Sequence, residues 1–212
     1  MRAAGPLTPI SGVDCGAEKL TTGEPEKDWA TPPPPLEATL ILAALGRHGV
    51  EYVLIGGFGA QLHRASVTTD DLDITPRKTP ENLQRLAAAL KEMGTRLRAE
   101  GLPAGGVRIP VDEHTFGQMM TVTFITAHGP LDVALSPDGT GGYDDLVQNA
   151  ATVLFAGLEI QLADLGDIIR LKDAAGRVKD RAALPELRRR LAEMQSESTD
   201  PPRSDGQGGL RP

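Results

Sequence analysis

The sequence has few of the residues that mark several common protein classes. It contains one cysteine, Cys15, and only one tryptophan, two tyrosines and four phenylalanines among 212 residues. A single cysteine excludes an internal disulfide framework and a cysteine-ligated zinc site, and it fits a reducing compartment. With so few aromatic side chains, the core has to be packed with Leu, Ile, Val and Ala, which is feasible in one ordinary domain.

Long hydrophobic runs are also absent. The longest uninterrupted apolar stretch, residues 40–45, is far shorter than the roughly 20 residues that span a bilayer. The N-terminal residues show no apolar run of signal-peptide length. We therefore expect a cytoplasmic protein without a membrane partner.

Charge is unevenly distributed along the chain. The formal net charge is −7, which argues against a protein whose main task is tight, nonspecific binding of nucleic acid, because that task requires Lys and Arg to neutralise phosphates. Residues 167–190 nevertheless hold eight Lys or Arg side chains against four Asp or Glu, a local excess of +4. This segment is a candidate docking surface for a polyanion.

Proline and glycine delimit the domain. Residues 1–36 contain seven of the 17 prolines, and residues 196–212 consist mainly of Ser, Asp, Gly and Pro. Segments of these compositions contain too few apolar side chains to form a buried core. We predict a disordered Pro-rich leader at 1–36, one domain at 37–195 and a disordered tail at 196–212.

Helical and strand periodicities alternate within that domain, which predicts an α/β (α+β) fold. Thr79 is a candidate N-cap with Pro80 at the first helical position, and Asp164 is a candidate N-cap of a basic helix ended by Gly176. The expected helices are residues 36–48, a short stretch to about 64, 79–94, 164–175 and a last helix after Asp180. The expected strands are 51–55, 72–74 and a hairpin of 120–126 with 131–135.

The segment richest in chemistry lies between the first two strands. The first strand ends at Gly56-Gly57, a short helix follows, and the second strand presents Asp71 and Asp73. Side chains at i and i+2 of a strand point to one face, so the two carboxylates converge, and paired carboxylates are ligands that Mg²⁺ (or Mn²⁺) prefers. Glycines beside a helix start also let backbone N–H groups approach a triphosphate. Taken singly, Asp-x-Asp is equally typical of a solvated edge strand, and Gly-Gly of a tight turn.

In its order and spacing, this pattern resembles the nucleotidyltransferase superfamily, the DNA polymerase β-like fold, in which a mixed β-sheet is flanked by helices and a helical segment follows at the C-terminus. More narrowly, residues 42–191 resemble the AbiEii/MenT-type nucleotidyltransferase toxins of toxin–antitoxin systems. The closer likeness rests on the strand around Asp132, the segment 142–146 and the blocks 163–172 and 175–180. Val67 stands where that group usually has Arg, which leaves Arg64 or Arg77 as the candidate phosphate contact at that edge.

The resemblance implies a set of site residues. Asp71, Asp73 and Asp132 would hold two Mg²⁺ ions, and Gly56, Gly57 and Thr69 would bind the nucleotide. Lys172 would neutralise charge on the triphosphate, and Asp180 would have a catalytic or substrate-positioning role. From the residues alone, Lys172 is as typical of a solvated lysine on an amphipathic helix, and Asp180 of an N-cap of the last helix.

The resemblance also implies an activity. A metal-dependent nucleotidyltransferase would move a nucleoside monophosphate from an NTP, such as ATP or CTP, to the 3′ end of tRNA, as a toxin with a cognate antitoxin. Phosphorylation of Thr69 would silence it, because a phosphate there adds negative charge beside the carboxylates. Two alternatives stay open: a nucleotidyltransferase that modifies an aminoglycoside-like small molecule or a protein, and a nucleotide-binding partner that keeps the fold without turnover.

Overall fold

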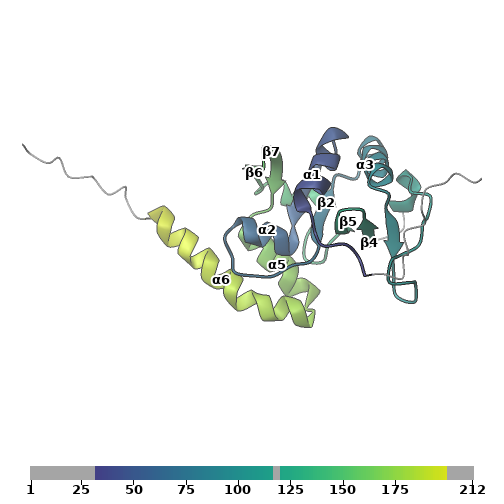
Figure 1. Ribbon diagram of the computed structural model, residues 1–212. Helices are drawn as coiled ribbons and strands as arrows, with labels where there is room; N and C mark the ends of the chain where they lie inside the picture. Colours follow the sequence, from purple (N-terminus) through teal and green to yellow (C-terminus); the bar gives the residue numbers. More distant parts are fainter. Residues whose placement is uncertain (1–31, 117–119, 200–212) are drawn as a thin grey trace, which may run out of the picture.

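The computed structural model describes residues 32–116 and 120–199 (Figure 1). The helices are α1 (Ala38–Arg47), α2 (Gly56–Leu62), α3 (Pro80–Glu92), the 3₁₀ turn η1 (Glu113–Phe116), α4 (Tyr143–Leu146), α5 (Leu165–Ala175) and α6 (Val178–Thr199). The strands are β1 (Tyr52–Ile55), β2 (Leu72–Pro76), β3 (Arg96–Arg98), β4 (Thr121–Thr126), β5 (Gly129–Ala134), β6 (Ala151–Phe155) and β7 (Leu158–Leu162).

The strands form one seven-stranded sheet in the order β3-β4-β5-β2-β1-β7-β6. Strands β2 and β5 pair in parallel, as do β1 and β7, and the other neighbours are antiparallel. The predicted α/β class, with a mixed sheet flanked by helices and a helical C-terminal segment, is confirmed.

Helices cover both faces of the sheet. Figure 1 shows α1 and α3 on one side, and α2, α5 and α6 on the other. Leu72 and Ile74 of β2 are fully buried in the core beneath α1 and α3. Val53 and Ile55 of β1 belong to the second core, with α5 and α6. Side chains alternate along a strand. Asp71 and Asp73, on either side of Leu72, therefore face the side of the sheet that α2, α5 and α6 cover.

The predicted helix caps are present. The Thr79 hydroxyl accepts a hydrogen bond from the N–H of Asn82 at 3.3 Å, and Pro80 is the first residue of α3. The Asp164 carboxylate accepts from the N–H of Gly166 at 2.7 Å at the start of α5, and Gly176 in the left-handed conformation ends that helix. Both local predictions from sequence are therefore confirmed.

Three strands were not predicted, β3 and the β6–β7 hairpin. The hairpin turns on Ala156 and Gly157, which have φ of 49° and 82°. Two-residue turns with positive φ usually have the sequence Asn-Gly or Asp-Gly. Ala-Gly is not typical of such a turn, so the sequence did not indicate the hairpin. Strand β6 lies at the sheet edge, and its sequence, ATVLF, places apolar Leu154 on the exposed face as well as Val153 and Phe155 against the core, so no polar–apolar alternation marks it as a strand.

The last helix differs at both ends from the prediction. It begins at Val178, so Asp180 lies in its first turn and does not cap it, and it continues to Thr199. Most of the predicted leader and tail, with Cys15, lies outside the described residues. Among the helices that are described, none combines the length and the hydropathy needed to cross a membrane.

Candidate active site

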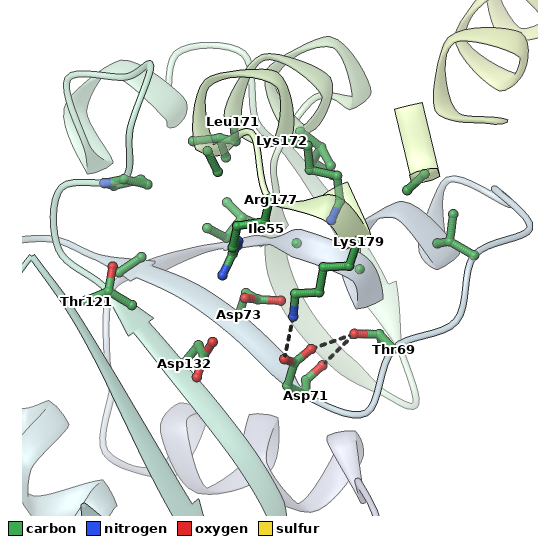
Figure 2. A pocket seen from close by; sticks show the side chains of 18 of the residues that line it. Ile55, Thr69, Asp71, Asp73, Thr121, Asp132, Leu171, Lys172, Arg177 and Lys179 are labelled. Carbon is green, nitrogen blue, oxygen red and sulfur yellow. Dashed lines mark hydrogen bonds and ion pairs between the residues drawn. The ribbon is translucent and has the colours of Figure 1, made fainter. Parts of the chain in front are cut away.

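Three carboxylates meet on the α5 and α6 side of the sheet. Asp73 of β2 is the register partner of Asp132 on the parallel strand β5, and Asp71 precedes Asp73 by two residues on the same face. One carboxylate oxygen of each residue lies within 4.8 Å of the others, and all three residues are half-buried. Figure 2 shows the three side chains facing a common space. The structure thus brings together the three aspartates that the sequence singled out.

Burial and the close approach of the three carboxylates shift the pKa values of two of them. Burial, followed by the neighbouring charges of Asp71 and Asp132, raises the pKa of Asp73 from 3.8 to about 7. Burial also raises the pKa of Asp132, although a hydrogen bond from Thr123 opposes the shift. Among the residues that the structure describes, the Oδ1 atom of Asp132 is buried and has no hydrogen-bond partner. A buried carboxylate oxygen without a donor is unfavourable unless a cation satisfies it.

The donor set fits a divalent cation. It consists of carboxylate oxygens alone, which is the chemistry that Mg²⁺ and Mn²⁺ prefer over nitrogen or sulfur ligands. A cation there would satisfy Asp132 Oδ1 and offset the repulsion that raises the pKa of Asp73.

Thr69 and Lys179 contact the exposed side of the cluster, at Asp71. The Thr69 hydroxyl donates a hydrogen bond of 2.6 Å to Asp71 Oδ1. The Lys179 ammonium lies 3.7 Å from Asp71 Oδ2. Figure 2 shows Lys179 reaching from the start of α6 to this carboxylate. Thr69 therefore fixes the orientation of Asp71, while Lys179 supplies a nearby positive charge.

Gly56 and Gly57 are packed against two of these side chains. A Cβ on Gly56, whose φ is +69°, would overlap Asp73 Oδ2. A Cβ on Gly57 would lie 2.6 Å from both Cβ and Oγ1 of Thr69. Both positions therefore require glycine for a reason independent of any ligand. Their predicted contact with the triphosphate stays a prediction.

Lys172 and Asp180 form a buried ion pair at the joint between α5 and α6. The Lys172 ammonium donates to Asp180 Oδ1 at 2.8 Å, and Arg177 Nε donates to Asp180 Oδ2 at 2.7 Å. The Asp180 side chain is fully buried, and these two cations lower its pKa although burial alone would raise it. Asp180 does not line the cavity beside the carboxylates, whereas Lys172 and Arg177 do. The geometry thus gives Asp180 a supporting position behind the two cations.

A cavity of about 540 Å³ opens between the Gly56-Gly57 turn, the carboxylates and the α5–α6 joint. This volume is within the range of small-molecule sites. Its polar wall contains Gly56, Gly57, Thr68, Thr69, Asp71, Asp73, Asp132, Lys172, Arg177 and Lys179, and its apolar wall contains Ile55, Val67, Ile168, Leu171 and Ala175. One wall is therefore anionic and another cationic, with an apolar surface beside them.

A second cavity of about 660 Å³ lies against the same carboxylates. It shares Asp70, Asp71, Asp132 and Lys179 with the first cavity. The other residues that line it are Arg98 at the end of β3, residues 99–104 after it, Thr123 and Pro130. The carboxylate cluster thus lies between the first and the second cavity.

The structure places the candidate phosphate-contacting arginines outside the first cavity. Arg77 pairs with Glu51 at 2.9 Å beyond the far end of β2, and neither Arg64 nor Arg77 lines the first cavity. Of the described residues, the cations that line it besides Lys172 are Arg177 and Lys179. Both belong to the block 175–180, on which the family resemblance partly rests. That block was the sequence feature that could have identified them, although neither residue was singled out.

The basic segment is also less available than its composition indicates. Seven of the eight basic side chains counted in residues 167–190 are ion-paired, and Arg181 donates to the carbonyl of Gly176 at 2.8 Å. Several partners, such as Asp145, Glu193 and Glu197, lie outside the counted window. Local acids therefore offset part of the positive charge of the expected polyanion surface.

No protein-family model matches the chain, and no curated protein matches it either. Among solved structures, the lincosamide antibiotic adenylyltransferase LnuA bound to lincomycin is 13% identical, with a TM-score of 0.49, over 73% of this chain and 98% of that one. The antibiotic-resistance factor ANT(2'')-Ia in solution is 15% identical, with a TM-score of 0.40, over 74% and 92%. ANT(2'')-Ia in complex with adenylyl-2''-tobramycin is 16% identical, with a TM-score of 0.46, over 74% and 89%.

Proposed function

We propose that this protein is a metal-dependent nucleotidyltransferase that moves a nucleoside monophosphate from an NTP to an acceptor hydroxyl. The observation that carries the proposal is the cluster of Asp71, Asp73 and Asp132, with oxygens within 4.8 Å of one another. The Oδ1 atom of Asp132 is buried there and finds no hydrogen-bond partner in the described part of the chain. These three carboxylates would hold the pair of divalent cations, which would supply Lewis-acid stabilisation of the charge that develops during the transfer.

The residues of the chain account for the remaining requirements of this reaction. Lys172 and Arg177 present positive charge to the first cavity, and Asp180 behind them holds both in place. Fixed cations lower the free energy of a triphosphate whose negative charge shifts to the leaving pyrophosphate. Thr69 orients Asp71 through its hydrogen bond. We therefore place the NTP in the first cavity, with its phosphates toward Lys172 and Arg177.

The two cavities suit an in-line displacement. In that geometry the acceptor oxygen attacks the α-phosphorus from the side opposite the leaving pyrophosphate. With the NTP in the first cavity, the second cavity is the place from which an acceptor can approach the same carboxylates. We therefore assign it to the acceptor.

The walls favour a small polar acceptor over tRNA. Apart from the proposed metal ligands, the charged residues that line the second cavity within residues 32–116 and 120–199 are Asp70 and Glu100 against Arg98 and Lys179, an even balance. A polyanion needs a continuous basic path, and the basic segment at 167–190 is ion-paired. The tRNA acceptor and the antitoxin remain predictions of the family resemblance.

The test is incubation with Mg²⁺ and each α-labelled NTP in the presence of separate acceptor pools: tRNA, total protein, and hydroxyl-bearing small molecules such as tobramycin and lincomycin. The account predicts label on a small-molecule acceptor. Label on tRNA alone would overturn the acceptor assignment but keep the activity. NTP binding without label on any pool would favour the binding partner that lacks turnover. Glu159→Gln, an exposed carboxylate on β7, is the matched control for variants of the cluster.

A further inference from the structure

Lys179 stands at the border between the two cavities. Among the described residues, it is the cation that both cavities share. Its side chain is 66% exposed, and its ammonium lies 3.7 Å from Asp71 Oδ2. That distance is longer than a hydrogen bond, so the ammonium compensates the carboxylate without being fixed to it.

The other two cations of the first cavity are held differently. Lys172 and Arg177 each donate to Asp180, whose side chain is fully buried, at 2.8 and 2.7 Å. Within the described residues, the ion-pair partner of Lys179 is Asp71, a member of the carboxylate cluster itself. Exposed ion pairs of this kind are weak and exchange readily. Lys179 is therefore the cation in this wall that can change partners.

We propose that Lys179 is a tethered counter-ion whose ammonium exchanges between the carboxylate cluster and the phosphates of the NTP. This inference rests on the proposed function. Without a divalent cation, its ammonium offsets part of the charge of Asp71. A cation bound by Asp71 removes that attraction, and the ammonium then faces the first cavity, where the phosphates lie. Lys179 thus competes with the metal in the nucleotide-free protein and supports nucleotide binding once the metal is present.

The test measures Mn²⁺ binding to the full chain by the loss of the free-ion EPR signal, without nucleotide. Lys179→Met keeps the length of the side chain and removes the charge, and we expect it to bind Mn²⁺ roughly two- to fivefold more tightly than the unaltered protein. Lys179→Arg should restore the original affinity. Arg181→Met is the matched control, because Arg181 lies on the same helix and lines neither cavity. With Mn²⁺ saturating, Lys179→Met should bind ATP more weakly than the unaltered protein.

The outcomes separate this inference from the function on which it rests. If the unaltered protein binds no Mn²⁺, both fail. If it binds Mn²⁺ and Lys179→Met binds with equal or lower affinity, the counter-ion role is wrong while the metal site stands. Lys179→Gln, checked by its melting curve, provides a second neutral variant should Lys179→Met fold poorly.

Discussion

The α-carbon of Gly56 lies against the carboxylate of Asp73, so closely that a Cβ at this position would overlap Asp73 Oδ2. Gly56 begins the Gly-Gly motif and Asp73 ends the Asp-x-Asp motif, and the antiparallel pairing of β1 with β2 brings them together. The same relation joins Gly57 to Thr69. The Gly56-Gly57 segment and the aspartate strand are therefore one packed unit, so the two motifs depend on each other structurally.

Gly57→Ala tests this packing. A Cβ at 2.6 Å from Thr69 Oγ1 displaces the hydroxyl and breaks its hydrogen bond to Asp71. Because displacements near 1 Å in a reacting geometry can lower rates on the order of 100-fold, we expect a loss of that size in label transfer. Gly46→Ala on α1, where a Cβ meets nothing within 4 Å, should leave transfer unchanged. Equal transfer by Gly57→Ala and Gly46→Ala would show that the close approach has no bearing on the site.

Variants of Asp180 and Lys172 separate two roles of Lys172: its structural role in the buried ion pair and the positive charge that it presents to the first cavity. Asp180→Asn leaves Lys172 without its buried partner, and we expect a destabilisation of about 3 kcal/mol, measured by urea unfolding. The double change Lys172→Met with Asp180→Leu removes both charges and should recover most of that loss.

In the double variant, transfer should stay low, because the cation that faces the triphosphate is gone. Recovery of both stability and transfer would mean that Lys172 serves only the packing of α5 on α6. A control at Asp173→Asn, whose exposed carboxylate pairs with Arg188 at 3.5 Å, should change neither quantity.

The sequence predicted most of what depends on local chemistry. The caps at Thr79 and Asp164 and the convergence of Asp71 and Asp73 follow from short-range rules and are present in the structure. It could not predict the ion pairs of the α5–α6 joint, because Asp180 reads as a cap until the helix start at Val178 is known. The edge hairpin was missed because its turn lacks Asn or Asp. The roles of the site residues, in contrast, are still predictions that only activity measurements can test.

The pKa of Asp73, about 7 in the folded protein against an ordinary 3.8, predicts a pH dependence. The folded, metal-free protein holds this proton more tightly than the unfolded chain. Its stability should therefore fall as the pH rises from about 4 to 7, and Asp73→Asn should reduce that fall. A divalent cation competes with the proton, so Mg²⁺ should raise the melting temperature more at pH 8 than at pH 5.5. An equal increase at both pH values would contradict the electrostatic account of the cluster.

Thr69 remains the predicted site of regulatory phosphorylation. Its hydroxyl donates at 2.6 Å to Asp71 Oδ1, and a phosphate removes that donor and adds about −1.5 to −2 charges beside three carboxylates. We expect protein phosphorylated at Thr69 to lose nucleotide transfer. The measurement is label transfer by protein whose modification is established by mass spectrometry, with Thr69→Val as the control that removes the hydroxyl without adding charge. Full transfer by the phosphorylated protein would exclude the switch.

The most direct test of the proposed function follows the two ends of the nucleotide separately. Parallel reactions with α-labelled and γ-labelled NTP, Mg²⁺ and the acceptor pools are run with the unaltered protein, Asp73→Asn and Glu159→Gln. We predict that the α-label moves to an acceptor, that the γ-label is released as pyrophosphate, and that Asp73→Asn reduces both to background while Glu159→Gln does not. Transfer of the γ-label to an acceptor, or undiminished transfer of the α-label by Asp73→Asn, would contradict nucleotidyl transfer at this carboxylate cluster.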